Sequence, residues 1–145
     1  MLDTNVVLDW LLFRDAAIAP MAQMITVRQA RWVATDAMRQ ELEHVLGRSR
    51  IAAWHAASAD ILAGWAHWVE PAVARSPSLA QPLRCSDTDD QKFIDLALQV
   101  GAAALLSRDR AVLKLAGRAK ATGLDIVTPA TWARQRGSAA RASVD

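Results

Sequence analysis

The sequence opens with Met1-Leu2-Asp3-Thr4-Asn5-Val6-Val7-Leu8, and this stretch decides the fold because one carboxylate joins a short apolar run to a helix-compatible run. Thr4 and Asn5 favour helix N-caps, and apolar residues recur at helical spacing behind them. The pattern predicts a strand that ends at Asp3 and a helix that follows. Ligands of open α/β sheets bind outside the carboxyl ends of the strands, so Asp3 is a site candidate. The alternative is that Asp3 only caps the helix.

Length and composition indicate one globular domain, because the chain has 145 residues, 52% of them hydrophobic and 22% charged. We expect this domain to span residues 1–136 and the small and polar residues 137–145 to form a disordered tail. The N-terminus lacks a basic region ahead of an apolar run, and no uncharged stretch is long enough for a membrane span. We therefore expect a cytoplasmic protein. Cys85 is the single cysteine, which excludes an internal disulfide and a thiolate metal cluster.

Strand-like and helix-like segments alternate along the chain. After the opening strand, the expected strands are residues 32–34, 102–107 and 124–127. The expected later helices are residues 18–31, 37–46, 111–121 and 130–136, and residues 51–69 form one helix or a pair of helices. A further helix is expected from about residue 88 to 100, opening on a capping box of Thr88 and Gln91. Pro71, Pro77 and Pro82 indicate a loop before that helix. This alternation predicts an α/β fold with a parallel sheet and helices on its faces.

Four acids lie at or just after predicted strand ends, or in the helices that follow: Asp3, Glu41, Asp90 and Asp109. We expect them to converge. Two unit charges about 4 Å apart repel by about 4 kcal/mol at an effective dielectric near 20, so such a cluster needs protons or a bound cation. Carboxylate oxygens select hard cations such as Mg²⁺ or Mn²⁺ over zinc. Such ions bind phosphates and activate water, which suits the hydrolysis of a phosphodiester.

At these residues the chain resembles PIN-domain ribonucleases of the kind found as toxins in bacterial toxin–antitoxin pairs. The resemblance covers Met1 to about Trp132, and four segments occur in the family's order and spacing. They are Leu-Asp-Thr-Asn-Val at residues 2–6, Glu41-Leu42, the Asp-rich entry at residues 87–90 followed by Phe93 and Ala97, and Leu-Leu-Ser-Arg-Asp at residues 105–109. The resemblance implies a single PIN-like domain, a three-layer α/β/α structure with a central, mostly parallel sheet.

The resemblance also implies a function. Asp3, Glu41, Asp90 and Asp109 would be the catalytic, metal-binding acids, and Asn5 and Ser107 would orient the first and last of them. The cofactor would be Mg²⁺ or Mn²⁺, and the substrate single-stranded RNA. The implied protein partners are a cognate antitoxin and a second copy of the chain in a homodimer.

The sequence departs from the family pattern in two places. Only Met1 and Leu2 precede Asp3, where the family has a longer apolar run. Many members carry a further Asp two or three residues after the last acid, where this chain has Ala111 and Val112. With fewer carboxylates there, the sequence does not decide between one metal ion and two. A PIN-like binding or scaffold protein with weak or no catalysis is the alternative to an active nuclease.

Charge is unevenly distributed: residues 1–107 contain 9 Lys/Arg and 12 Asp/Glu, whereas residues 108–145 contain 8 and 3. A basic C-terminal third suits contact with a polyanion, and the candidate RNA-binding residues are Arg108, Arg110, Lys114 and Arg118. An ordinary solvated helix face is the alternative.

Two tryptophans in the aromatic middle of the chain also allow two interpretations. Trp65 and Trp68 lie at helical spacing with Ile61, so we expect them in the core. An exposed patch for a partner is the alternative.

Overall fold

The computed structural model describes residues 1–48, 50–76 and 83–143. The predicted turns at Pro77 and Pro82 and the last two residues of the predicted tail lie outside the described residues. The helices are α1 (Thr4–Leu11), α2 (Ala19–Thr26), α3 (Asp36–Arg48), α4 (Ala52–Trp68), η1 (Thr88–Asp90), α5 (Gln91–Gln99), α6 (Arg110–Leu113), α7 (Ala116–Ala119), η2 (Lys120–Thr122) and α8 (Pro129–Ala142). The strands are β1 (Trp32–Ala34), β2 (Val69–Pro71), β3 (Ala104–Leu106) and β4 (Asp125–Val127).

The strands among the described residues all pair in parallel, which confirms the predicted α/β class. In register, β1 lies beside β2 with Trp32 opposite Val69, and β3 lies beside β4 with Ala104 opposite Asp125. The opening segment joins β3 through a single parallel bridge between Leu2 and Leu106, and the amide of Asp3 donates to the Leu106 carbonyl at 3.1 Å. The described strands thus form two parallel pairs.

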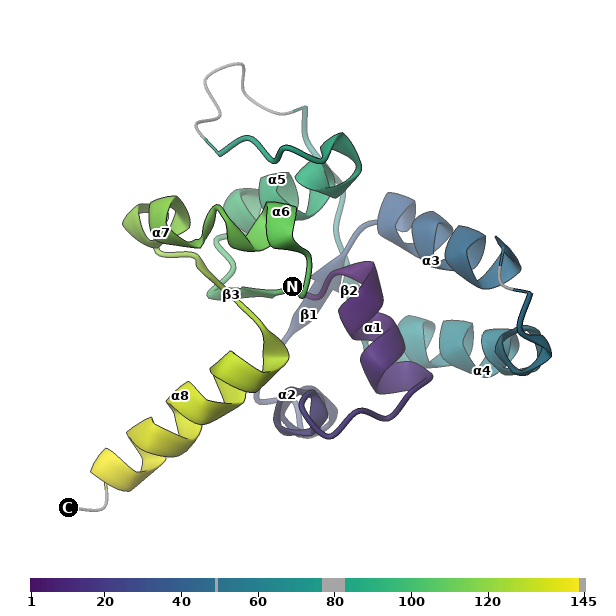
Figure 1. Ribbon diagram of the computed structural model, residues 1–145, viewed down its shortest axis with the longest axis horizontal. Helices are drawn as coiled ribbons and strands as arrows, with labels where there is room; N and C mark the ends of the chain where they lie inside the picture. Colours follow the sequence, from purple (N-terminus) through teal and green to yellow (C-terminus); the bar gives the residue numbers. More distant parts are fainter. Residues whose placement is uncertain (49, 77–82, 144–145) are drawn as a thin grey trace.

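The strands lie at the centre of the molecule (Figure 1). Helices α5, α6 and α7 lie on one side of them, and α1, α3 and α4 lie on the other. Helix α8 extends away from this body towards the C-terminus (Figure 1). The largest fully buried side chains come from both sides and include Trp32, Met38, Leu42, Phe93, Ile94 and Leu105. One core therefore joins the segments that carry the predicted acids.

The predicted loop at Pro71 and the predicted single helix of residues 111–121 were both wrong. The expected loop at Pro71 is strand β2, which pairs with β1 and ends where the Ala72 amide donates to the Ala34 carbonyl at 2.9 Å. Pro71 has no N–H to offer, but a strand end at the edge of a pair tolerates that loss. The expected helix of residues 111–121 is divided into α6, α7 and η2. Gly123 ends this region with φ +82°, a left-handed conformation that favours glycine.

The predicted disordered tail is wrong for residues 137–142, because they continue helix α8. Thr128 begins this helix by accepting the Thr131 amide at 3.1 Å, and Pro129 occupies its first turn. Alanine and arginine are strong helix formers, and together they outweigh the low helix propensity of Gly137. The expected boundary at residue 136 therefore falls inside a helix.

The core interpretation of the central tryptophans is confirmed for Trp65, which is buried and meets the Trp32 ring edge-on with 4.9 Å between centroids. Trp68 is half-buried, and the Arg28 guanidinium lies 5.5 Å from its ring centroid. Within the described ranges, no helix combines the length and apolar character that a membrane crossing needs.

Candidate active site: an acidic cluster at the strand ends

The two oxygens of the Asp3 carboxylate make different contacts: one caps helix α1, and the other binds Ser107. Its Oδ1 accepts the Val6 amide at 2.9 Å, so Asp3 is the N-cap of α1 in place of Thr4 or Asn5. Its Oδ2 accepts a short hydrogen bond from the Ser107 hydroxyl. Asp3 is only 4% exposed, and this burial raises its pKa, although the hydrogen bonds from Ser107 and Val6 act in the opposite direction. The two roles considered for Asp3 are therefore compatible.

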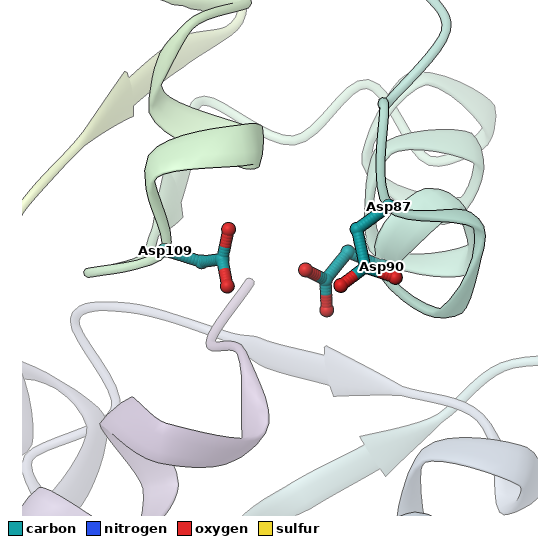
Figure 2. A group of neighbouring side chains, drawn as sticks. All are labelled: Asp87, Asp90 and Asp109. Atoms are coloured by element: carbon teal, nitrogen blue, oxygen red, sulfur yellow. The ribbon is translucent and has the colours of Figure 1, made fainter.

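Three further carboxylates point towards one another (Figure 2). Asp109 faces Asp87 and Asp90 across a gap, and one oxygen of each side chain lies within 4.8 Å of the others. Asp87 and Asp90 come from the turn that contains η1, and Asp109 from the residue before α6. This arrangement brings together two of the predicted acids, Asp90 and Asp109, and adds Asp87.

Two of these acids, Asp87 and Asp109, are themselves helix N-caps, and this contact orients their side chains. Asp109 Oδ1 accepts the Ala111 amide at 2.7 Å, and Asp87 Oδ1 accepts the Asp89 amide at 3.0 Å. The predicted capping box of Thr88 and Gln91 was wrong, because Asp87 is the N-cap of η1. The side chain of Gln91 instead accepts the Cys85 amide at 2.6 Å and donates to the Leu83 carbonyl at 2.8 Å.

Ser107 connects two of the acids, since its hydroxyl donates to Asp3 and its Oγ accepts the Asp109 amide at 3.0 Å. Asn5, the other predicted orienting residue, is exposed in the first turn of α1. An orienting role for either residue stays a prediction.

Glu41 lies on α3 and reaches two other elements. Its Oε2 accepts a short hydrogen bond from the Thr4 hydroxyl, and its Oε1 accepts the Lys92 ammonium at 2.8 Å. Sequence reasoning missed Lys92 because this contact joins residues 51 positions apart in the chain.

The acids act on one another electrostatically. The pKa of Asp90 is raised to about 6, first by burial and then by the negative charges of Asp109, Asp87, Asp3 and Glu41. We call these five residues, Asp3, Glu41, Asp87, Asp90 and Asp109, the acidic cluster. Asp87 was missed as a candidate, although its spacing of three residues from Asp90 is a signal that one turn of a helix places both on one side.

The four candidate RNA-binding residues are not equivalent. The Arg108 guanidinium contacts Asp9 Oδ1 at 2.6 Å, and Asp9 is buried in α1. Burial raises the pKa of Asp9, and the charge of Arg108 partly offsets that rise. Arg108 therefore anchors the segment between Ser107 and Asp109 to α1. Arg110, Lys114 and Arg118 are exposed in the same region.

The acidic cluster is separate from a groove that Trp32 and Trp132 help to line. That groove has a volume of about 560 Å³ and is lined by both apolar and polar residues, including Met1, Met24, Trp32, Ala104 and Trp132. The five acids are not among its lining residues. The acidic cluster therefore lies outside this groove.

Comparison with known proteins gives one match. A family model described as PIN domain matches residues 1–111, a range that contains all five acids. No curated protein and no solved structure matches the chain.

The raised pKa of Asp90 predicts that stability of the metal-free protein depends on pH. The folded-state pKa of about 6 exceeds the ordinary 3.8, so this contribution to stability is complete below about pH 3.8 and is lost as pH rises through about 6. Asp90→Asn has no charge to bury. In EDTA at pH 7.5 it should be more stable than wild type by about 1 kcal/mol, since solvent screens this half-exposed group.

Urea unfolding at pH 7.5 and pH 4 measures this effect, and the gain should shrink strongly at pH 4. Asp89→Asn is the matched control, because Asp89 is an exposed acid of the same turn that is not one of the three grouped carboxylates. It should change the free energy of unfolding by less than about 0.5 kcal/mol at either pH. An equal gain for Asp90→Asn at both pH values would contradict the account of its charge.

Proposed function

The chain belongs to the PIN-domain family, whose members are generally metal-dependent nucleases, and from this premise we propose that it hydrolyses phosphodiester bonds of single-stranded RNA. The proposed cofactor is Mg²⁺ or Mn²⁺, held by the acidic cluster. The observation that carries the proposal is the grouping of Asp87, Asp90 and Asp109, whose oxygens lie within 4.8 Å of one another.

The donor set fits a hard divalent cation. It consists of carboxylate oxygens alone, the ligands that Mg²⁺ and Mn²⁺ prefer, and it contains no thiolate or imidazole in the described group. The raised pKa of Asp90 indicates negative charge that a cation would neutralise. When bound, such an ion supplies Lewis-acid stabilisation of phosphate charge and lowers the pKa of water.

Each acid has a proposed role. Asp3, Asp90 and Asp109 hold the cation, and Asp87 adds an oxygen that the sequence alone did not suggest. Glu41 reaches in from α3 to hold the cation or to accept a proton from the attacking water. Ser107 orients Asp3 and Asp109 through its two hydrogen bonds, and Asn5 is the proposed orienting residue on α1. Water adds to phosphorus in line with the leaving oxygen, so no protein nucleophile is required.

The alternative of a scaffold without catalysis rested on the missing acid at Ala111 and Val112. Val112 is fully buried and Ala111 is half-buried. Asp87 supplies a further carboxylate beside Asp90 and Asp109. The number of acids near the site thus supports the enzyme over the scaffold.

The first functional prediction concerns cleavage. Asp90→Asn keeps the size of the side chain but removes charge, so it should lower the cleavage rate at least about 100-fold while the protein stays folded. The assay compares wild type, Asp90→Asn and Asp89→Asn on an unstructured RNA with Mn²⁺, Mg²⁺ or EDTA. Asp89→Asn should cleave like wild type. Cleavage that survives EDTA, or an Asp90→Asn variant as fast as wild type, would sink the mechanism and favour the scaffold.

The second concerns substrate binding by the exposed basic residues after β3. Arg110, Lys114 and Arg118 are proposed to neutralise RNA phosphates, with Arg108 contributing the part of its guanidinium that Asp9 leaves exposed. Arg110→Ala should reduce the slope of log affinity against log salt by about 0.7, the value for one lost phosphate contact on a single strand. The control is Arg141→Ala, at the far end of α8. Equal salt-dependence slopes for wild type and Arg110→Ala would contradict phosphate binding by Arg110 and favour the alternative of an ordinary solvated helix face.

The third concerns the biological role. We propose a cytoplasmic toxin that acts as a homodimer and is neutralised by a cognate antitoxin protein, as the family resemblance implies. Induced expression of wild type in bacterial cells should slow growth, and Asp90→Asn at the same protein level should not, because RNA cleavage causes the arrest. Normal growth with wild type that is shown to be folded and active on RNA in vitro would refute the toxin role.

A further inference from the structure

Lys92 places a cation directly at the acidic cluster. Its ammonium lies 2.8 Å from Glu41 Oε1 and 2.7 Å from the Asp89 carbonyl oxygen. Lys92 belongs to the first turn of α5, immediately after the turn that carries Asp87 and Asp90, and it is half-buried. The same ammonium lies 5.3 Å from the centroid of the Phe93 ring.

Both oxygens of Glu41 are therefore engaged in this structure. Oε2 accepts from Thr4, and Oε1 accepts from Lys92. Each oxygen keeps a second lone pair, so a divalent cation that binds Glu41 would share this carboxylate with Thr4 and Lys92. Thr4 is neutral, whereas the positive charge of Lys92 repels a second cation at the same carboxylate. A cation at Glu41 would therefore weaken the Lys92 contact more than the Thr4 contact.

The lysine side chain can leave a weakened contact. It is a point charge on a flexible four-carbon stem, so the ammonium can swing by several ångströms while the backbone of α5 stays in place. An ammonium released from Glu41 still lies beside the cluster, where an anionic substrate must arrive. A phosphate oxygen is the acceptor that this charge would meet there.

We propose that Lys92 holds Glu41 in the metal-free protein and, once a divalent cation takes that carboxylate, binds a phosphate oxygen of the RNA. This inference rests on the proposed function and deepens it. Lys92 is then a substrate-positioning residue that links occupancy of the metal site to substrate binding. It competes with the metal in the absence of RNA and favours RNA when the metal is bound.

The test uses Lys92→Met, which keeps the length of the stem and removes the charge. In the absence of RNA, titration calorimetry should show Mn²⁺ binding about three- to fivefold tighter than in wild type, since a partly exposed ion pair no longer competes. With saturating Ca²⁺, under conditions where a gel shows the RNA intact, the slope of log affinity against log salt should fall by about 0.7.

Two further variants make the result specific. Lys92→Arg keeps the charge and should retain both the wild-type Mn²⁺ affinity and the wild-type salt slope. Lys120→Met removes an exposed lysine of η2 and should change neither quantity. Circular dichroism verifies that each variant is folded.

The outcomes separate this inference from the proposed function. If wild type binds Mn²⁺ and cleaves RNA but Lys92→Met binds Mn²⁺ no more tightly, or keeps the full salt slope, the role of Lys92 is refuted and the nuclease stands. If wild type binds no Mn²⁺, the proposed function and this inference fail together. Tighter Mn²⁺ binding together with a smaller slope supports the role of Lys92.

Discussion

The mutual repulsion of five carboxylates at one end of the strands is the constraint on which the rest of the site depends. In the metal-free protein several compensations hold these groups together. Asp3 accepts hydrogen bonds from the Val6 amide and the Ser107 hydroxyl, Glu41 pairs with Lys92, and the pKa of Asp90 rises to about 6. None of these removes all of the negative charge. A divalent cation is the ligand that would neutralise the remaining negative charge of the carboxylates.

Helix capping positions much of this charge. Asp3, Asp87 and Asp109 are the N-caps of α1, η1 and α6, and each uses Oδ1 to accept a backbone amide. A cap restricts the side-chain rotamer, so the interactions that begin the helices also orient the carboxylates. The second oxygen of Asp3 accepts the Ser107 hydroxyl. The bridge between Leu2 and Leu106 then sets the spacing of Asp3 from Ser107 and Asp109.

Much of this arrangement could be predicted from the sequence where the signal is local. The run from Leu2 to Val6 and the short apolar strands predicted the α/β class. The positions of Asp3, Glu41, Asp90 and Asp109 after predicted strand ends identified them as site candidates. Contacts between distant segments carry no such signal. Lys92 meets Glu41 across 51 positions, and β2 is three residues long with a single strong strand former, Val69. The spacing of Asp87 from Asp90 is a local signal, but its grouping with Asp109 depends on how distant segments lie in space.

The central claim is that Asp87, Asp90 and Asp109 form a divalent-metal site. Anomalous diffraction from crystals grown or soaked with Mn²⁺ tests it most directly, because the signal locates the ion independently of any activity. The account predicts a peak about 2.0–2.3 Å from oxygens of Asp90 and Asp109, with Asp87 or Asp3 as a further ligand. A well-ordered crystal in saturating Mn²⁺ with no peak among these carboxylates, or with Mn²⁺ bound only elsewhere, would contradict it.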